Sequence, residues 1–221
     1  SKMRFSSRLD PGSLIQDIEN IEVFESAQAT GRGVLLLMPH LGCWEFMNVF
    51  LKGRTKVSAL YDKPNVSGLD DFITSTREKF GARMFPINIG GLRQVFKSLE
   101  RNELCVFLPD QVPDYGARGF IGTFFGHDAY TSDLVHRVIS KYDSEIVFGL
   151  VMRDFSEGRV KYRICFEKPA DEIYSKDVGV HIGSLNRSLE RLVMKAPEQY
   201  QWSYKRYKRL NKLEKNIYRR Q

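Results

Sequence analysis

The fold is decided by the stretch VLLLMPHLGCWE, residues 34–45. Its first five residues are continuously apolar, which is typical of a short strand covered on both faces of a sheet. Pro39 and Gly42 then indicate a turn, and residues 44–51 have the pattern of a helix. A strand, a turn and a helix in this order predict one unit of an α/β fold.

The same alternation continues along the chain. We expect further strands at 57–60, 84–87 and 104–108 and helices at 69–80, 91–101, 132–141 and 178–195. Residues 145–153 and 159–168 are predicted to form a hairpin, the one antiparallel pair. The Gly- and Pro-rich stretch 109–130 is predicted to be a long functional loop. Residues 1–221 are therefore expected to form a single α/β domain, with a mostly parallel mixed sheet flanked by helices.

Composition excludes several classes of protein. Hydrophobic residues make up 42% and charged residues 28% of the chain, so disordered and collagen-like classes do not fit. Three widely spaced cysteines without a CxxC pair argue against a disulfide framework or a structural zinc site, and we assign no metal. No apolar run approaches the roughly 18 residues of a membrane-spanning helix.

The positive charge is concentrated at one end. The tail, residues 201–221, holds eight basic residues and one acid, which equals the net charge of +7 of the whole chain. The rest of the chain is therefore neutral. Anionic lipid, nucleic acid and an acidic protein are the candidate partners of such a tail, but no recognised nucleic-acid motif accompanies it.

His40 lies where chemistry is expected, just beyond the carboxyl end of the strand at 34–38. Two helical residues five apart point about 140° away from each other, so His40 meets Glu45 only if His40 lies in the turn before the helix. Glu45 would then orient one imidazole nitrogen, and the other would accept a proton from a substrate alcohol. On the residues alone an alternative stays open, in which His40 caps the helix or packs in the core.

Beyond this pair the chain resembles a known family. Residues 40–45 have the H-x4-E form of the glycerolipid acyltransferase signature, and PHLGCWE is similar to the lauroyl/myristoyl acyltransferases of lipid A biosynthesis. The resemblance covers roughly residues 21–209. Further segments that follow the family's order are FGAR at 80–83, GGLRQVFKSLERNEL at 90–104, LPDQ at 108–111, FFG at 124–126 and PEQYQWSYKRYK at 197–208.

The resemblance implies a glycerolipid-acyltransferase-like fold and an activity. Such enzymes transfer a fatty acyl chain from acyl carrier protein to a hydroxyl of the lipid A precursor, at the cytoplasmic face of the bacterial inner membrane. The acyl thioester is then a co-substrate, and no cofactor is expected. The implied partners are acyl carrier protein, the lipid A precursor and an anionic membrane surface, with no nucleic acid. Family members typically carry an N-terminal transmembrane anchor, so we expect this chain to be a truncated form.

The resemblance also implies roles for single residues. His40 is the expected general base and Glu45 its orienting partner. Arg77 and Asp110 match residues that matter in the family, and they are expected to support catalysis or bind substrate, an arginine by stabilising an oxyanion or gripping a phosphate. The alternatives are a solvated helix face for Arg77 and a turn or helix cap for Asp110.

Three further residues are expected to contact substrate: Lys63, Arg83 and Gln111. Lys63 lies in YDKP, where family members often have YRP, so a point charge replaces the usual phosphate contact.

Other functions fit parts of the sequence. One is an acyltransferase of the same superfamily acting on a glycerol phosphate, a lysophospholipid or a mannoside. Another is a non-enzymatic basic module that binds membranes. The sequence does not decide the acyl chain length, the acylated hydroxyl, the oligomeric state or the choice between carrier-protein and coenzyme A thioesters.

Overall fold

The chain folds around a mixed sheet of seven strands, seen in a computed structural model that describes residues 11–61, 81–113, 116–156, 158–208 and 218. The strand order is β1-β9-β8-β2-β5-β3-β4. The bounds are β1 (Ile15–Glu19), β2 (Gly33–Leu37), β3 (Val57–Tyr61), β4 (Ala82–Pro86), β5 (Leu104–Phe107), β8 (Ser144–Asp154) and β9 (Lys161–Glu167). The predicted fold class is confirmed, including the antiparallel pairing of β8 with β9.

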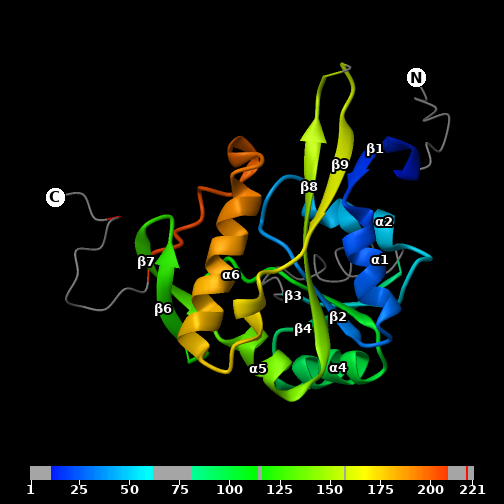
Figure 1. Cartoon of the computed structure of the whole chain (residues 1–221). Helices are drawn as coiled ribbons and strands as arrows, with labels where there is room; N and C mark the ends of the chain where they lie inside the picture. The colour runs from blue at the N-terminus through cyan, green and yellow to red at the C-terminus, as the bar shows by residue number, and fades with distance from the viewer. Residues whose placement is uncertain (1–10, 62–80, 114–115, 157, 209–217, 219–221) are drawn as a thin grey trace, which may run out of the picture.

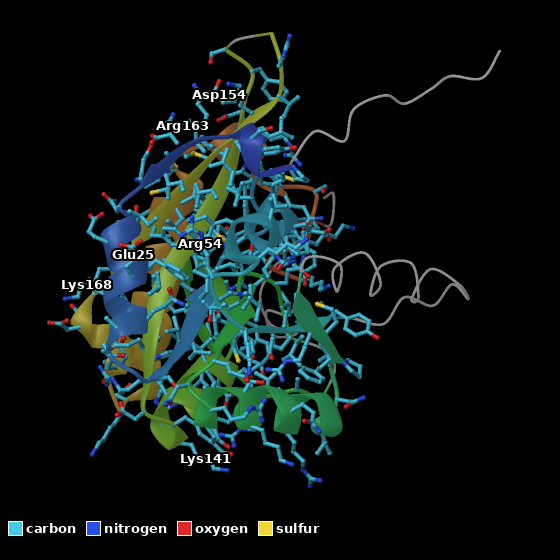
Figure 2. The ribbon with its side chains drawn as sticks, turned by 90° about the vertical axis from the view of Figure 1, so that its right-hand side faces the viewer. Glu25, Arg54, Lys141, Asp154, Arg163 and Lys168 are labelled. Atoms are coloured by element: carbon cyan, nitrogen blue, oxygen red, sulfur yellow. The ribbon has the colours of Figure 1, made fainter. Side chains whose placement is uncertain are left out.

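Five neighbouring strands, β8, β2, β5, β3 and β4, run parallel. Their carboxyl ends therefore lie along one edge, which we call the carboxyl edge. In Figure 2, Asp154 at the end of β8 and Lys141 shortly before its start lie toward opposite ends of the molecule. Ligands of open α/β sheets bind beyond the carboxyl ends of the strands, so this edge is where a site is expected.

Helices cover both faces of the sheet. Side chains alternate along β2: Leu35 and Leu37 pack with α4, α5 and α6, whereas Leu36 packs with α1 and α2 on the other face. Figure 1 shows α6 and α1 on opposite sides of β8. The helices are α1 (Ile21–Ala29), α2 (Met47–Leu51), α4 (Ile89–Glu100), α5 (Leu134–Lys141) and α6 (Val178–Val193), with short 3-10 helices η1 (Pro11–Leu14), η2 (Trp44–Phe46), η3 (Asp171–Tyr174) and η4 (Pro197–Gln199).

Local sequence explains where the two longest helices begin. The Asp177 side chain accepts hydrogen bonds from the backbone N–H groups of Gly179 and Val180 and so caps α6. Asn88 caps α4 by accepting from the N–H of Gly91. These helices confirm the predictions at 178–195 and 91–101, with slightly different ends. The helix predicted at 69–80 lies outside the described residues.

The prediction of an irregular loop over residues 109–130 is wrong. Most of its second half forms a separate antiparallel hairpin, β6 (Gly119–Phe124) and β7 (His127–Ser132). Its two-residue turn holds Phe125 at φ 48° and Gly126 at φ 75°, the left-handed pair that suits a tight hairpin. Phenylalanine is an unusual residue at a positive φ. The Asn-Gly or Asp-Gly pair that usually marks such a turn is missing from the sequence. The hairpin packs on α6. Strand β1 and helix α1 also had no predicted counterpart.

The structure provides one finding on membrane crossing. Within the described part of the chain, no helix combines the length and the apolar character that a bilayer span requires.

Candidate active site

The turn after β2 carries His40 and is held at several points. The backbone N–H of Met38 donates to the carbonyl of Phe107, which continues the β2–β5 ladder by one residue. Gly42 then adopts φ 60°, and a Cβ on this residue would lie 2.0 Å from the carbonyl oxygen of Val151. Only glycine fits there. The N–H of Cys43 donates to that same oxygen at 2.9 Å, so the end of β8 fixes the turn.

This geometry confirms that His40 precedes the helix. The predicted helix over 44–51 is divided into η2 and α2, and His40 lies in the turn before η2. Its ring meets the edge of Trp44, with 5.8 Å between the ring centroids.

Asp110 holds His40 through both of its carboxylate oxygens. Oδ1 lies 2.7 Å from His40 Nδ1, and Oδ2 accepts the backbone N–H of His40 at 2.8 Å. The register explains the meeting. Leu37 pairs with Phe107 in the parallel β2–β5 ladder, and each site residue follows its own strand by three positions. The Asp110 side chain is 1% exposed and that of His40 is 21% exposed.

The pairing determines which imidazole nitrogen is available for chemistry. An ionised carboxylate only accepts hydrogen bonds, so Nδ1 of a neutral His40 carries the proton and Nε2 carries the lone pair. A partly exposed histidine in this tautomer is ready to take a proton from a ligand.

The structure differs from the sequence expectation in the residue that orients His40. Glu45 was expected to orient one of the two imidazole nitrogens, and the acid that the structure places at Nδ1 is Asp110. Glu45 lies in η2 with an exposed side chain. Its role in the reaction stays a prediction.

The segment 197–206, from the sequence motif near the C-terminus, packs against the His40 turn. The N–H of Gln201 donates to the carbonyl of His40 at 3.1 Å, and the N–H of Gly42 donates to the carbonyl of Gln199 at 3.0 Å. The Gln199 amide group also exchanges two hydrogen bonds with the backbone of Arg153, at 2.8 and 2.9 Å. The His40 turn is therefore held by hydrogen bonds to this segment, which is itself bound to the end of β8.

Two more groups of this segment lie near Asp110. Burial, and after it the nearby charge of Asp110, raise the pKa of Tyr200 well above its ordinary value. Burial lowers the pKa of Arg206, whose guanidinium donates to the carbonyl of Tyr130 at 2.7 Å and to Thr131 Oγ1 at 2.6 Å. Asp110 and Tyr200 oppose this lowering through their charge interactions with Arg206. The sequence singled out the motif but gave neither residue a role.

Comparison with known proteins identifies the family of this chain. The family described as bacterial lipid A biosynthesis acyltransferase matches residues 1–209. The chain belongs to that family. It is 28% identical over 201 residues to the lipid A biosynthesis palmitoleoyltransferase of Escherichia coli K12, covering 87% of this chain and 61% of the relative. It is 24% identical over 199 residues to the lauroyltransferase of that organism, with the same two coverages.

A third relative is the lipid A biosynthesis myristoyltransferase of E. coli K12, which is 23% identical over 192 residues, covering 86% of this chain and 58% of the relative. The chain thus spans about three fifths of the length of these curated relatives.

Of the other residues predicted for the site, the structure places one near His40 and one far from it. Gln111 reaches the site, since its side-chain amide donates to Gln201 Oε1 at 3.3 Å. Arg83 does not, because it lies near the start of β4, at the edge opposite His40. There it forms an ion pair with Glu103, the residue before β5. Its expected contact with substrate finds no support in this placement.

Lys63 and Arg77 lie outside the described residues, so their predicted roles stay predictions. The assignment of no metal is also untested. Within the described ranges, His, Cys, Asp and Glu side chains form no group of three or more that would hold an ion.

Proposed function

We propose that this protein transfers a fatty acyl chain from an acyl thioester, carried by acyl carrier protein, to a hydroxyl of a lipid A precursor. The observation that carries the proposal is the pair His40–Asp110, because it presents Nε2 as a base at the carboxyl edge. Membership of the lipid A acyltransferase family and the names of the relatives support this choice of substrate class.

The proposed reaction needs no protein nucleophile. His40 Nε2 takes the proton of the acceptor hydroxyl while the oxygen of that hydroxyl attacks the thioester carbonyl. The tetrahedral intermediate collapses, the carbon–sulfur bond breaks, and the imidazolium returns the proton to the leaving thiolate. Products are the ester and the free thiol of the carrier, so atoms and charge balance. Asp110 holds the ring and stabilises the imidazolium throughout.

The remaining predicted residues have proposed roles in this scheme. Glu45, the acid of the H-x4-E motif, is proposed to assist His40 by stabilising its imidazolium in addition to Asp110. Arg77 is proposed to stabilise the oxyanion or to grip a phosphate, and Lys63 to place a charge near a substrate phosphate. We also propose that the protein acts at the cytoplasmic face of the inner membrane, with anionic lipid as the partner of the basic residues of 201–221 other than the buried Arg206.

The proposal is tested by His40→Ala against a matched control, His127→Ala. His127 is an exposed histidine of β7, so its loss removes an imidazole without touching the site. The assay follows labelled acyl chain from acyl carrier protein to a lipid A precursor. His40→Ala should lose about 10²–10⁴ in rate, the typical contribution of a general base. The His127 variant should keep the parent rate.

A folded His40→Ala protein with parental transfer would refute the assignment of the base. Mass spectrometry of lipid A from cells with and without the intact gene identifies the transferred chain. An unchanged set of secondary acyl chains would contradict the proposed acceptor.

A further inference from the structure

A surface cavity of about 360 Å³ lies between α5, the start of β6 and the segment that leads into α6. Lys141, the last residue of α5, lines it and lies toward the opposite end of the molecule from Asp154 (Figure 2). The nearby start of β8, Ser144, is seven residues before Val151, whose carbonyl holds the His40 turn. That length of strand is roughly 23 Å. A small ligand in this cavity is therefore remote from His40.

The cavity carries an excess of positive charge. Four cationic side chains and one acidic side chain line it: Arg118, Arg137, Lys141, Lys176 and Asp133. The two lysines form no ion pair with any described residue. Cations that share one cavity with so little compensation repel one another, and an anionic ligand relieves this repulsion.

The two arginines are oriented by the buried side chain of Asp133, which is 2% exposed. Its Oδ2 lies 3.3 Å from Nε of Arg118, and its Oδ1 accepts the Nε–H of Arg137 at 3.0 Å. The Nη atoms of both arginines have no hydrogen-bond partner among the described residues. These N–H groups form the fork with which arginine binds phosphate and carboxylate groups. Asp133 thus holds two guanidinium groups in place and leaves their forks for a ligand.

Part of the lining is apolar. Phe120 of β6, which is 38% exposed, and Val178, the first residue of α6, lie beside the cationic side chains. The volume is also many times the roughly 30 Å³ that one water molecule occupies in the liquid. The cavity therefore has room and apolar surface for the carbon part of a ligand as well as for its charged group.

We propose that this cavity binds an organic phosphate, either a soluble phosphate ester or a phospholipid headgroup. The Nη groups of the two arginines and the ammonium groups of the two lysines hold the phosphate oxygens, and the carbon part of the ligand lies against Phe120 and Val178. A phosphate group fits better than a single carboxylate, because it brings a charge of about −1.5 to −2 and three acceptor oxygens. The site is independent of the proposed transfer at His40.

The test measures binding of phenyl phosphate by isothermal titration calorimetry at about 0.15 M salt. The parent protein should bind it with a Kd below about 1 mM and should bind inorganic phosphate more weakly. Lys176→Met and Arg137→Met should each raise the Kd about tenfold or more, since each removes a charged hydrogen bond. Lys176→Met breaks no ion pair with the described residues, so it reads binding without disturbing Asp133.

The matched control is Arg163→Met. Arg163 is 41% exposed and pairs with Glu19, much as Arg137 is 46% exposed and pairs with Asp133, but Arg163 lies near Asp154 at the other end of the molecule (Figure 2). This variant should keep the parental Kd. A parental Kd above about 1 mM, or equal Kd values in the parent and the two cavity variants, would overturn the proposal. Binding of a polyglutamate peptide without binding of phenyl phosphate would also overturn it, in favour of a surface for an acidic protein.

Vesicles of phosphatidylcholine with phosphatidic acid identify the source of the phosphate. Weaker sedimentation of Lys176→Met than of the parent and of Arg163→Met would assign the site to a lipid headgroup. Equal sedimentation of all three, together with binding of phenyl phosphate, would assign it to a soluble phosphate ester. These measurements read binding alone, so they are not affected if the protein fails to transfer acyl chains.

Discussion

Asp110→Asn keeps the shape of the side chain but removes its negative charge and one of its two hydrogen-bond acceptor atoms. Asparagine has one oxygen and one NH₂ group where aspartate has two oxygens. The oxygen can face either the backbone N–H of His40 or Nδ1, which lie 2.8 and 2.7 Å from the two oxygens in the structure. If the oxygen accepts the backbone N–H, the NH₂ group faces Nδ1 and forces the proton onto Nε2. The base is then lost.

The other amide orientation is unfavourable for a different reason. It places the NH₂ group against the backbone N–H, so two donors face each other in a buried site. The first orientation therefore dominates, and the rate of transfer should fall by about 10²–10⁴, the whole contribution of the general base. Because the substitution replaces a hydrogen bond to a buried charged group by one to a neutral group, it should lower the free energy of unfolding by about 1–3 kcal/mol.

The assay measures single-turnover transfer from acyl carrier protein beside thermal unfolding of the same preparation. A severe loss of rate in a protein that remains folded at the assay temperature supports the tautomer argument. Parental rates in Asp110→Asn would refute it, and a loss of rate equal to the loss of folded fraction would make Asp110 a structural residue only.

Two further substitutions test the turn after β2 and the placement of Arg83 away from the site. Gly42→Ala should destabilise the fold well beyond the roughly 1–2 kcal/mol of left-handed strain, because its Cβ would lie 2.0 Å from the Val151 carbonyl. Gly53→Ala is the matched control, since Gly53 has φ 76° but nothing within 4 Å of its Cβ, and similar losses of denaturation free energy in both variants would contradict this reasoning. Arg83→Met should leave transfer unchanged and lower stability at neutral pH by about 1–2 kcal/mol, a modest figure because Arg83 is partly exposed. Burial opposes ionisation of Glu103, but arginine hydrogen bonds outweigh it and hold its pKa below the ordinary value. That stabilisation is present at neutral pH and is lost as the pH falls through the lowered pKa, so the difference in stability between the parent and Arg83→Met should shrink toward acid pH in unfolding curves. Reduced transfer by stable Arg83→Met would restore its predicted contact with substrate.

The strand and turn over residues 34–45 were predictable because each depends on neighbouring residues. An apolar run buried on both faces and a glycine in a turn leave their signal in the local pattern. Asp110 was also recognised as a candidate. Its direct pairing with His40 was not, because that depends on which strands lie side by side.

The missing information was the register. Once β2 and β5 are known to be parallel neighbours, Leu37 and Phe107 pair, and counting three residues from each brings His40 to Asp110. The β6–β7 hairpin was missed for a related reason. Packing on α6 stabilises a turn whose Phe125 is a poor local signal for left-handed backbone.

The hydrogen bonds from residues 199–201 to the His40 turn have a consequence for biosynthesis. His40 and Asp110 are both translated before this segment. The segment 197–206, whose hydrogen bonds hold the turn, is synthesised only near the end of the described residues. A nascent chain stopped before this point contains His40 and Asp110 without the hydrogen bonds that hold the His40 turn. The turn is therefore expected to be completed only late in synthesis, when this last motif docks against it.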